Sequence, residues 1–268
     1  MTDRISVREA GHGTPLVLLH AFPLSSRMWR EQLDELPGVD GSGARVLAVD
    51  LRGFGGTELG EDEPSLDLLA DDVALLLDQA GIEKAVVGGL SMGGYVAMAL
   101  ARRHPDRLSG LLLADTKATP DTDQARANRE RVAAAVLARD SVQLLLDEQV
   151  PSPLLGVTSV QERPRLTERL RGMVEEASPR AVAWAQRAMA SRPGSLDVLA
   201  EVRVPALVLV GEEDVITPPS DAEAMAAVLP DVVLTVLPAV GHLANIESPD
   251  AFNWAVRGLL ARVEEDSG

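Results

Sequence analysis

The chain has 268 residues, of which 46% are hydrophobic, and a formal net charge of −16 at pH 7. A chain of this length can bury one large core and carry an insertion, while its excess of negative charge argues against nucleic acid as a partner, because phosphates would be repelled. The absence of cysteine excludes disulfides, thiolate nucleophiles and thiolate metal sites.

Short apolar runs alternate with helical patterns along most of the chain. Seven runs rich in valine and leucine predict strands, at Ile5 to Glu9, Leu16 to His20, Arg45 to Asp50, Lys84 to Gly89, Leu108 to Ala114, Ala206 to Val210 and Val232 to Leu237. Most are continuously apolar, which is typical of parallel strands covered on both faces. Helical patterns lie between them, at Ser26 to Leu36, Leu66 to Ala80, Met92 to His104, Ser220 to Leu229 and Pro249 to Val263. This alternation predicts an α/β fold with a mostly parallel central sheet flanked by helices.

One long stretch has helical patterns and no convincing strand. Between Asp115 and Pro205, prolines separate four helical segments, Asp123 to Arg139, Ser141 to Gln149, Arg163 to Glu176 and Ser178 to Ser191. We expect a helical lid, inserted after the strand ending near Ala114 and lying over the carboxyl edge of the sheet. The predicted division is a core domain of residues 1–115 and 205–268 and a helical cap of residues 116–204.

The segment Gly89-Leu90-Ser91-Met92-Gly93 lies between a predicted strand and a predicted helix. This context makes the G-x-S-x-G pattern a candidate nucleophile elbow, a strained turn that exposes a serine hydroxyl. Strand and helix then approach so closely that side chains at positions 89 and 93 would collide, and both positions are glycine. Ser91 is therefore the candidate nucleophile. An ordinary strand-to-helix connection is the alternative interpretation.

A serine nucleophile needs a base, and the chain has only four histidines. His12 lies in a glycine turn, His104 ends a helix, and His20 closes a strand and is expected to support the following loop. His242 follows the last predicted strand, so it should lie at the carboxyl edge of the sheet, where Ser91 also points. We therefore predict that His242 is the general base.

The third member should be an acid that orients His242. Asp214 lies on the loop after the strand ending at Val210, at the same edge of the sheet. Asp115 also follows a strand and is the second choice, while the neighbouring Glu212 and Glu213 are expected to be solvated loop charges. The order Ser91, Asp214, His242 is that of nucleophile, acid and base in α/β-hydrolases.

Two backbone N–H groups are candidates for an oxyanion hole. Met92 directly follows the nucleophile, and Phe22 lies on the loop after the strand Leu16 to His20. The ring of Phe22 can pack in the same loop while its N–H serves as a donor. Dispersed histidines and the lack of cysteine predict no metal site. No cofactor is expected.

These motifs together resemble the α/β-hydrolase fold superfamily over essentially the whole chain. The resemblance is carried by His20-Ala21-Phe22-Pro23, Asp50-Leu51-Arg52-Gly53-Phe54-Gly55, Gly89 to Gly94, Gly211-Glu212-Glu213-Asp214 and Gly241-His242. It implies a triad of Ser91, His242 and Asp214, oxyanion donors at Phe22 and Met92, and structural roles for Asp50 and Arg52. Ala21 departs from the family pattern, which usually has glycine there. The lid length and Ser-Met-Gly-Gly further resemble 3-oxoadipate enol-lactonases and cofactor-free haloperoxidase-like esterases.

The predicted activity is that of a serine hydrolase cleaving an ester or lactone bond of a small molecule through an acyl-enzyme. Two alternatives remain open. The same triad would serve a C–C bond hydrolase or a cofactor-free perhydrolase or haloperoxidase, and a non-catalytic ligand-binding module would keep the fold without the chemistry.

The expected partner is a small acyl compound, and the sequence does not give the oligomeric state. Trp29 and Trp184 are candidates to line the substrate pocket, although core packing is the alternative for both. Cap arginines, among them Arg126, Arg129 and Arg163, suggest an anionic or polar substrate. No apolar stretch reaches the roughly 20 residues of a membrane span, and Met1 to Glu9 lacks the apolar core of a signal peptide. We therefore expect a cytoplasmic protein without a membrane partner.

Overall fold

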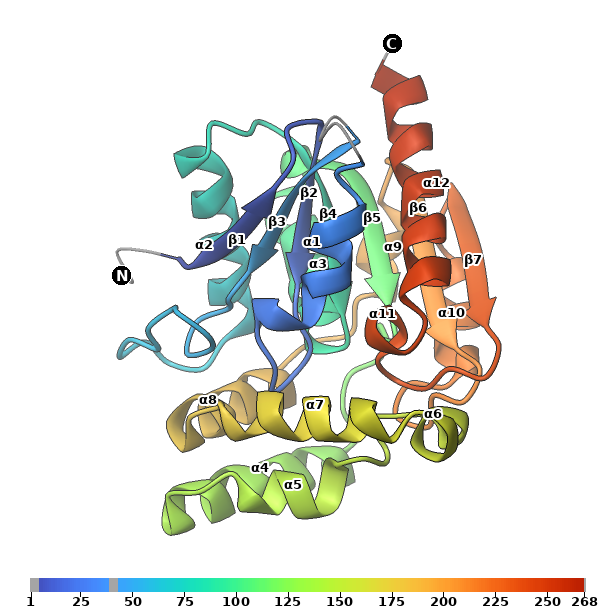
Figure 1. Ribbon diagram of the computed structural model, residues 1–268. Helices are drawn as coiled ribbons and strands as arrows, with labels where there is room; N and C mark the ends of the chain where they lie inside the picture. The colour runs from blue at the N-terminus through green and yellow to red at the C-terminus, as the bar shows by residue number, and fades with distance from the viewer. Residues whose placement is uncertain (1–4, 39–42, 268) are drawn as a thin grey trace.

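The computed structural model describes residues 5–38 and 43–267, so the ends of the predicted core domain extend beyond the described residues. Seven strands form one sheet in the order β1-β3-β2-β4-β5-β6-β7 (Figure 1). Six of them run parallel, and only β1 pairs antiparallel, with β3. The strands are β1 (Val7–Ala10), β2 (Thr14–Leu19), β3 (Ala44–Val49), β4 (Ala85–Leu90), β5 (Leu108–Ala114), β6 (Ala206–Gly211) and β7 (Val232–Leu237). The predicted α/β class and its mostly parallel sheet are confirmed.

Burial explains why the central strands are continuously apolar. Every residue of β4 and β6 is buried, because helices cover both faces of the sheet there. The apolar run of β7 has a different environment, since β7 is the last strand of the sheet. Val233 and Val236 remain 45% and 43% exposed, so an apolar run alone does not establish that both faces of a strand are buried.

Helices lie on both faces of the sheet (Figure 1). One face carries α1 (Arg30–Glu35) and the long C-terminal α12 (Pro249–Ser267), with the short η1 (Ser26–Trp29) and α11 (Ala244–Glu247) beside them. The other face carries α2 (Leu66–Gln79), α3 (Met92–Arg103), α9 (Leu196–Ala200) and α10 (Pro219–Ala226), and η2 (Pro105–Arg107) follows α3. Among the described residues, no helix combines the length and apolar character needed to cross a bilayer.

The segment between β5 and β6 is helical. Before α9, it forms α4 (Asp123–Arg139), α5 (Gln143–Gln149), α6 (Val157–Glu162), α7 (Pro164–Glu175) and α8 (Pro179–Ala190). Figure 1 shows these five helices gathered beyond the carboxyl ends of the strands, and we call them the cap. The sequence predicts all of them except α6, whose six residues begin without a side-chain N-cap and are too few to show a helical period.

The helix α3 packs against the sheet through two positions that have no side chain. A Cβ atom at Gly89 would lie 2.1 Å from the backbone of Gly93, and one at Gly93 would lie 2.0 Å from the backbone oxygen of Leu19. Neither distance is compatible with a side chain, because backbone atoms cannot move aside as a flexible side chain can. The predicted collision is therefore confirmed, and it determines where the turn at Ser91 lies.

We expect Gly93→Ala to destabilise the protein by about 3 kcal/mol or more, because the added methyl group meets backbone rather than open space. Gly172→Ala provides the matched control. Gly172 is exposed within α7, and a Cβ atom there would meet nothing within 4 Å, so alanine should stabilise the helix by about 0.5–1 kcal/mol. Denaturant unfolding of both variants measures the two effects. Equal midpoints for the two variants would contradict this account of α3 packing.

Candidate active site

The turn between β4 and α3 holds Ser91 in a backbone conformation that L-residues rarely adopt. Its φ is 55° and its ψ is −112°, a strained combination for a residue with a side chain. Two neighbours brace the turn: the N–H of Ser91 donates to the Ala114 carbonyl at 3.0 Å, and Thr116 Oγ1 donates to the Ser91 carbonyl at 2.8 Å. The serine is thereby held on a rigid support between the ends of β4 and β5.

Loops after β6 and β7 bring a carboxylate and an imidazole to this serine. His242 Nε2 lies 2.9 Å from Ser91 Oγ, and His242 Nδ1 lies 2.8 Å from Asp214 Oδ2. His242 is 1% exposed and Asp214 is 2% exposed, so both polar groups are shielded from solvent. The structure thus places the three predicted side chains in one hydrogen-bonded line.

The surroundings of Asp214 set both its orientation and its charge. Its Oδ1 accepts from the N–H groups of Ile216 at 2.8 Å and Thr217 at 3.0 Å, and its Oδ2 accepts from Thr217 Oγ1 at 2.7 Å. Burial by itself raises the pKa of Asp214, but His242 and these donors outweigh burial and hold the pKa below its ordinary value. An ionised Asp214 accepts a hydrogen bond from the N–H at Nδ1 of His242, which leaves Nε2 unprotonated and free to accept the Ser91 hydroxyl proton.

The two predicted oxyanion donors have free N–H groups. Within the described part of the chain, neither the N–H of Phe22 nor that of Met92 donates to a protein acceptor. Ala21, which replaces the usual glycine, is fully buried, and its N–H contacts Met28 Sδ at 3.2 Å. The Phe22 ring packs edge-on against Phe54, with centroids 6.4 Å apart, so this residue packs in the loop while its backbone donor stays unused.

His20 supports the Phe22 loop from beneath. Its Nε2 lies 3.1 Å from the N–H of Leu51 and therefore accepts from it, so Nδ1 carries the proton and donates to the Ala21 carbonyl at 2.9 Å. Complete burial lowers the pKa of His20 to about 4, despite opposing contributions from the Ala21 carbonyl and Asp50. The expected supporting position of His20 is confirmed by these contacts.

Asp115, the second choice for the acid, makes no hydrogen bond to His242. It accepts instead from the N–H of Gly211 at 2.9 Å and the N–H of Ala244 at 3.1 Å, and it is completely buried. Burial, together with the nearby charge of Asp214, raises the pKa of Asp115 well above its ordinary value. Its contacts make it a brace between the β6 end and the His242 loop.

The other predicted charged residues have structural partners. Asp50 accepts from the N–H of Ser26 at 2.7 Å and of Gly56 at 2.9 Å, and Arg52 is paired with Asp62 and Asp72. Glu212 and Glu213 were expected to be solvated loop charges. Glu212 is exposed, whereas Glu213 is half-buried and has protein partners, because its carboxylate accepts from the N–H of Thr158 at 2.9 Å and from the Thr158 hydroxyl. Among residues 5–38 and 43–267, no cluster of three or more histidine, aspartate and glutamate side chains is placed to hold a metal ion.

The two candidate pocket tryptophans lie in different environments. Trp29 is fully buried, with its ring centroid 5.9 Å from that of Phe252. Trp184, on the cap helix α8, donates from Nε1 to the Asp62 carbonyl at 2.8 Å. Neither contact involves Ser91 or His242, and a substrate-lining role for either residue stays a prediction.

The three candidate cap arginines make ion pairs and hydrogen bonds with other residues of the protein. Arg126 pairs with Asp123 at 2.8 Å, Arg129 pairs with Asp121, and Arg163 donates to the Glu247 carbonyl and to Ser159 Oγ. These three side chains stabilise the cap and its contacts. The idea of an anionic substrate therefore gains no support from them.

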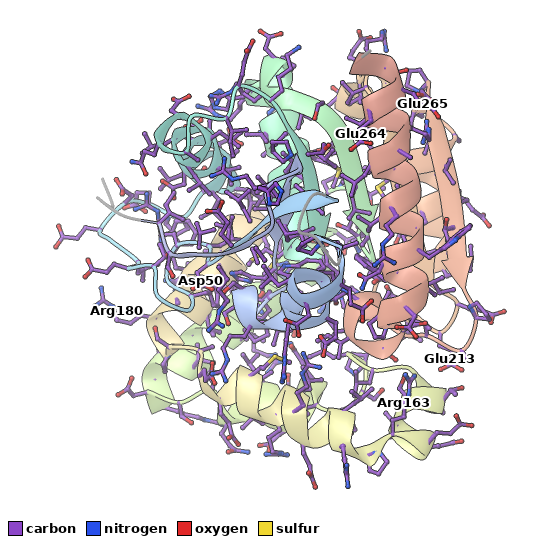
Figure 2. All side chains as sticks on the ribbon, turned by 45° about the horizontal axis from the view of Figure 1, so that its top comes forward. Asp50, Arg163, Arg180, Glu213, Glu264 and Glu265 are labelled. Atoms are coloured by element: carbon purple, nitrogen blue, oxygen red, sulfur yellow. The ribbon has the colours of Figure 1, made fainter. Side chains whose placement is uncertain are left out.

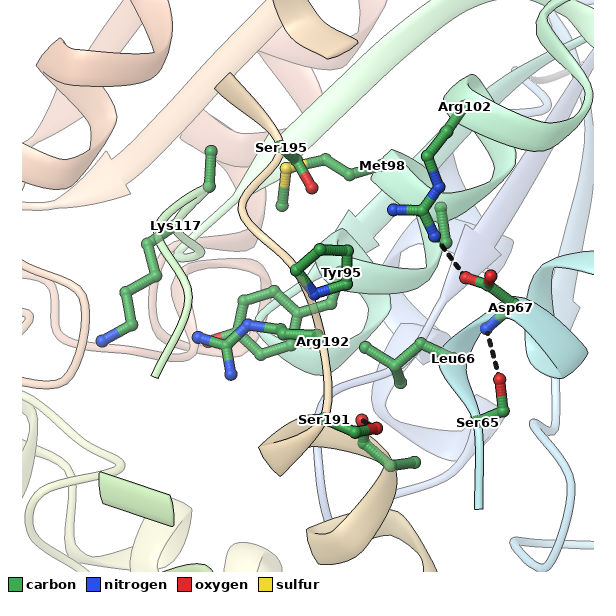
Figure 3. Close-up of a pocket in the computed structure, with 14 residues that line it drawn as sticks. Ser65, Leu66, Asp67, Tyr95, Met98, Arg102, Lys117, Ser191, Arg192 and Ser195 are labelled. Atoms are coloured by element: carbon green, nitrogen blue, oxygen red, sulfur yellow. Dashed lines mark hydrogen bonds and ion pairs between the residues drawn. The ribbon is translucent and has the colours of Figure 1, made fainter. Parts of the chain in front are cut away.

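A separate cavity of about 110 Å³ lies between α2, α3 and the segment after α8 (Figure 3). Its cationic lining includes Arg102, which pairs with Asp67, and Arg192, whose guanidinium lies 4.0 Å from the centre of the Tyr95 ring. None of the three residues aligned at Ser91 lines this cavity. We assign it no part in the chemistry of the site.

Residues that complete the site carry little signal in the sequence. Thr217 and Thr116 are small polar residues in loops, and only their hydrogen bonds to Asp214 and Ser91 distinguish them. Glu247 ends the four-residue helix α11, which is too short to show the helical spacing of apolar residues in the sequence. The only sequence signal is its proximity to His242, five positions earlier.

A mostly parallel sheet with serine, acid and histidine at its carboxyl edge defines the α/β-hydrolase class of fold. The family model described as "Alpha/beta hydrolase family" matches residues 16–255. The chain therefore belongs to the alpha/beta hydrolase family.

Two solved structures and one curated relative illustrate the similarity. A thermophilic esterase from Thermogutta terrifontis is 41% identical with a TM-score of 0.91, covering 97% of this chain and 93% of that one. The enol-lactonase from Burkholderia xenovorans is 25% identical with a TM-score of 0.83, covering 96% of each chain. 3-Oxoadipate enol-lactonase 2 from Acinetobacter baylyi is 27% identical, covering 92% of this chain and 88% of the relative. Esterases and lactonases are thus among its relatives, as the sequence resemblance implied.

The buried His20 makes the stability of the protein dependent on pH. Its pKa is about 4 in the folded state, against 6.5 ordinarily, so the unfolded state binds more protons between these values and stability falls as the pH drops below 6.5. From pH 7 to pH 5 we expect His20 to remove about 2 kcal/mol.

Urea unfolding at both pH values measures this loss, and His20→Gln should make it smaller. Glutamine keeps a donor and an acceptor at this position and does not titrate. An identical loss of stability in the wild type and the variant would rule out His20 as its source.

Proposed function

We propose that the protein is a serine hydrolase that cleaves an ester or lactone bond of a small molecule through an acyl-enzyme. The observation that carries the proposal is the hydrogen-bonded line from Ser91 Oγ through His242 to Asp214, with distances of 2.9 and 2.8 Å. Membership in a family that includes esterases and a lactonase supports the same reaction class.

In the first half of the reaction, Ser91 Oγ attacks the carbonyl carbon of the substrate. His242 Nε2 accepts the hydroxyl proton, and Asp214 stabilises the resulting imidazolium, which keeps its Nδ1 proton. The N–H groups of Phe22 and Met92 are free to donate to the oxygen that becomes negatively charged, and the start of α3 favours the same charge. His242 then protonates the departing alcohol, leaving the acyl group on Ser91.

In the second half, water replaces the alcohol. His242 removes a proton from the water, whose oxygen attacks the acyl carbonyl, and the same two N–H groups stabilise the second oxyanion. Collapse of that intermediate returns the proton to Ser91 and releases the acid. A lactone follows the same route, except that the alcohol and the acid remain in one product molecule.

Ser91→Ala should abolish ester hydrolysis, with a loss in kcat on the order of 10⁶-fold, because no other group supplies the nucleophile. Turnover of p-nitrophenyl esters and of lactones by purified protein measures the effect. The wild type should also be labelled by a fluorophosphonate probe, and the alanine variant should not. A wild type that neither turns over the panel nor takes up the probe would favour a binding module.

Asp214→Asn should lower kcat by about 10³- to 10⁴-fold, since the amide no longer stabilises the imidazolium or selects the required tautomer. Asp123→Asn is the surface control, because the Asp123 side chain is exposed at the start of α4 and pairs with Arg126 rather than with the aligned residues. Steady-state kinetics of both variants test the role of Asp214. A kcat for Asp214→Asn within tenfold of the wild type would exclude Asp214 as the orienting acid.

A further inference from the structure

The carboxylate of Glu247 is a buried acceptor beside the His242 loop. Glu247 ends α11 and is 1% exposed. Among the described residues, its two oxygens accept four hydrogen bonds, from the N–H groups of Gly241, Leu243 and Gly156 and from the hydroxyl of Ser159. No arginine or lysine side chain donates to this carboxylate within the described part of the chain. Its four hydrogen bonds go instead to the loop that carries His242 and to the cap.

Two of these donors lie on either side of His242. The N–H of Gly241 donates to Oε2 at 3.1 Å, and the N–H of Leu243 donates to Oε1 at 3.1 Å. The next N–H along the chain, that of Ala244, goes to the buried Asp115 at 3.1 Å. The backbone that carries the imidazole is therefore attached to buried carboxylates before and after His242.

The other two donors belong to the cap. The N–H of Gly156 donates to Oε2 at 3.0 Å, and Ser159 Oγ donates to the same oxygen at 2.5 Å. Gly156 and Gly241 pack backbone against backbone, because a Cβ atom on Gly241 would lie 2.1 Å from the nitrogen of Gly156. The Glu247 carboxylate thus joins the His242 loop to the start of α6, and the two segments are in direct backbone contact.

Neighbouring charges reinforce this junction. Arg163, which follows α6, donates to the backbone carbonyl of Glu247 and to Ser159 Oγ. Glu213, next to Asp214, accepts from the N–H and hydroxyl of Thr158. Figure 2 shows Arg163 and Glu213 where the cap meets the loops at the carboxyl edge of the sheet. The acid loop and the histidine loop are therefore both attached to α6.

We propose that Glu247 is a positioning residue that holds His242 in line with Ser91, a role that rests on the proposed function. Because the same carboxylate binds the cap, the position of His242 also depends on the attachment of the cap to the His242 loop. Glu247 touches neither Ser91 nor the imidazole through any of its hydrogen bonds. It acts by fixing the backbone on both sides of His242. A displacement of about 1 Å at a reacting group can cost 10²-fold in rate, so such a restraint has a measurable effect on catalysis.

The role requires a carboxylate rather than an amide. A glutamine at position 247 can place its oxygen where Oε2 accepts three hydrogen bonds, but its NH₂ group then faces the N–H of Leu243, donor against donor. The reverse orientation loses the other three. Glu247→Gln therefore keeps the size of the side chain and releases at least one side of the His242 loop.

We expect Glu247→Gln to lower kcat for an ester substrate by about 10- to 100-fold. Ser159→Ala removes one of the two cap donors and leaves both N–H groups beside His242 attached, so its loss of kcat should be smaller than that of Glu247→Gln. Asp121→Asn is the matched control for loss of a buried carboxylate, because Asp121 is paired with Arg129 and Arg192 and makes no hydrogen bond to the aligned residues. Its kcat should be unchanged.

A spectroscopic measurement separates positioning from general destabilisation. The proton between His242 Nδ1 and Asp214 should give a low-field NMR resonance. We expect this resonance to shift or broaden in Glu247→Gln and to stay in place in Asp121→Asn. An unchanged resonance with kcat within twofold of the wild type would overturn the proposal, and so would an equal loss of kcat in the Asp121 control. If the wild type has no hydrolase activity, the proposed function fails, while the resonance still decides whether Glu247 positions His242.

Discussion

The close approach of α3 to the sheet is the constraint from which the site follows. Gly89 and Gly93 leave no room for side chains, so the chain must turn sharply between β4 and α3, with Ser91 at a φ of 55°. The turn raises the hydroxyl above the carboxyl edge of the sheet and leaves the N–H of Met92 without a protein acceptor among the described residues. The loops after β2, β6 and β7 meet at this edge because their strands are parallel, and they add the Phe22 N–H, Asp214 and His242.

Much of this arrangement is predictable from the sequence, for a physical reason. Continuous valine and leucine runs predict parallel strands, and the carboxyl ends of parallel strands lie at one edge, so the residue after each run is a candidate for the site. That reasoning singles out Ser91, Asp214 and His242, and the structure places them within hydrogen-bonding distance. Both Asp214 and Asp115 follow strands; the segment Gly211 to Asp214, which carries the family resemblance, makes Asp214 the first choice, and its hydrogen bond to His242 agrees with that ranking.

The parts that could not be predicted depend on partners distant in sequence. Glu213 resembles a solvated loop charge, and a cap segment 55 positions away supplies its donors. Glu247 meets a donor 91 positions away, and the helices α6 and α11 on either side of that contact have six and four residues, too few to show a period. The arginine content of the cap likewise shows charge without showing that Arg129 and Arg163 bond within the protein.

The left-handed backbone at Ser91 implies a conflict between the stability of the folded protein and its catalytic activity. Glycine adopts such a φ without the steric penalty that a residue with a Cβ atom incurs, so a Ser91→Gly chain would be relaxed at the point where the wild type is strained. The inactive protein would then outlast the active one during heating or proteolysis. Retention of serine at this position would reflect selection for reactivity against the conformational preference of the fold.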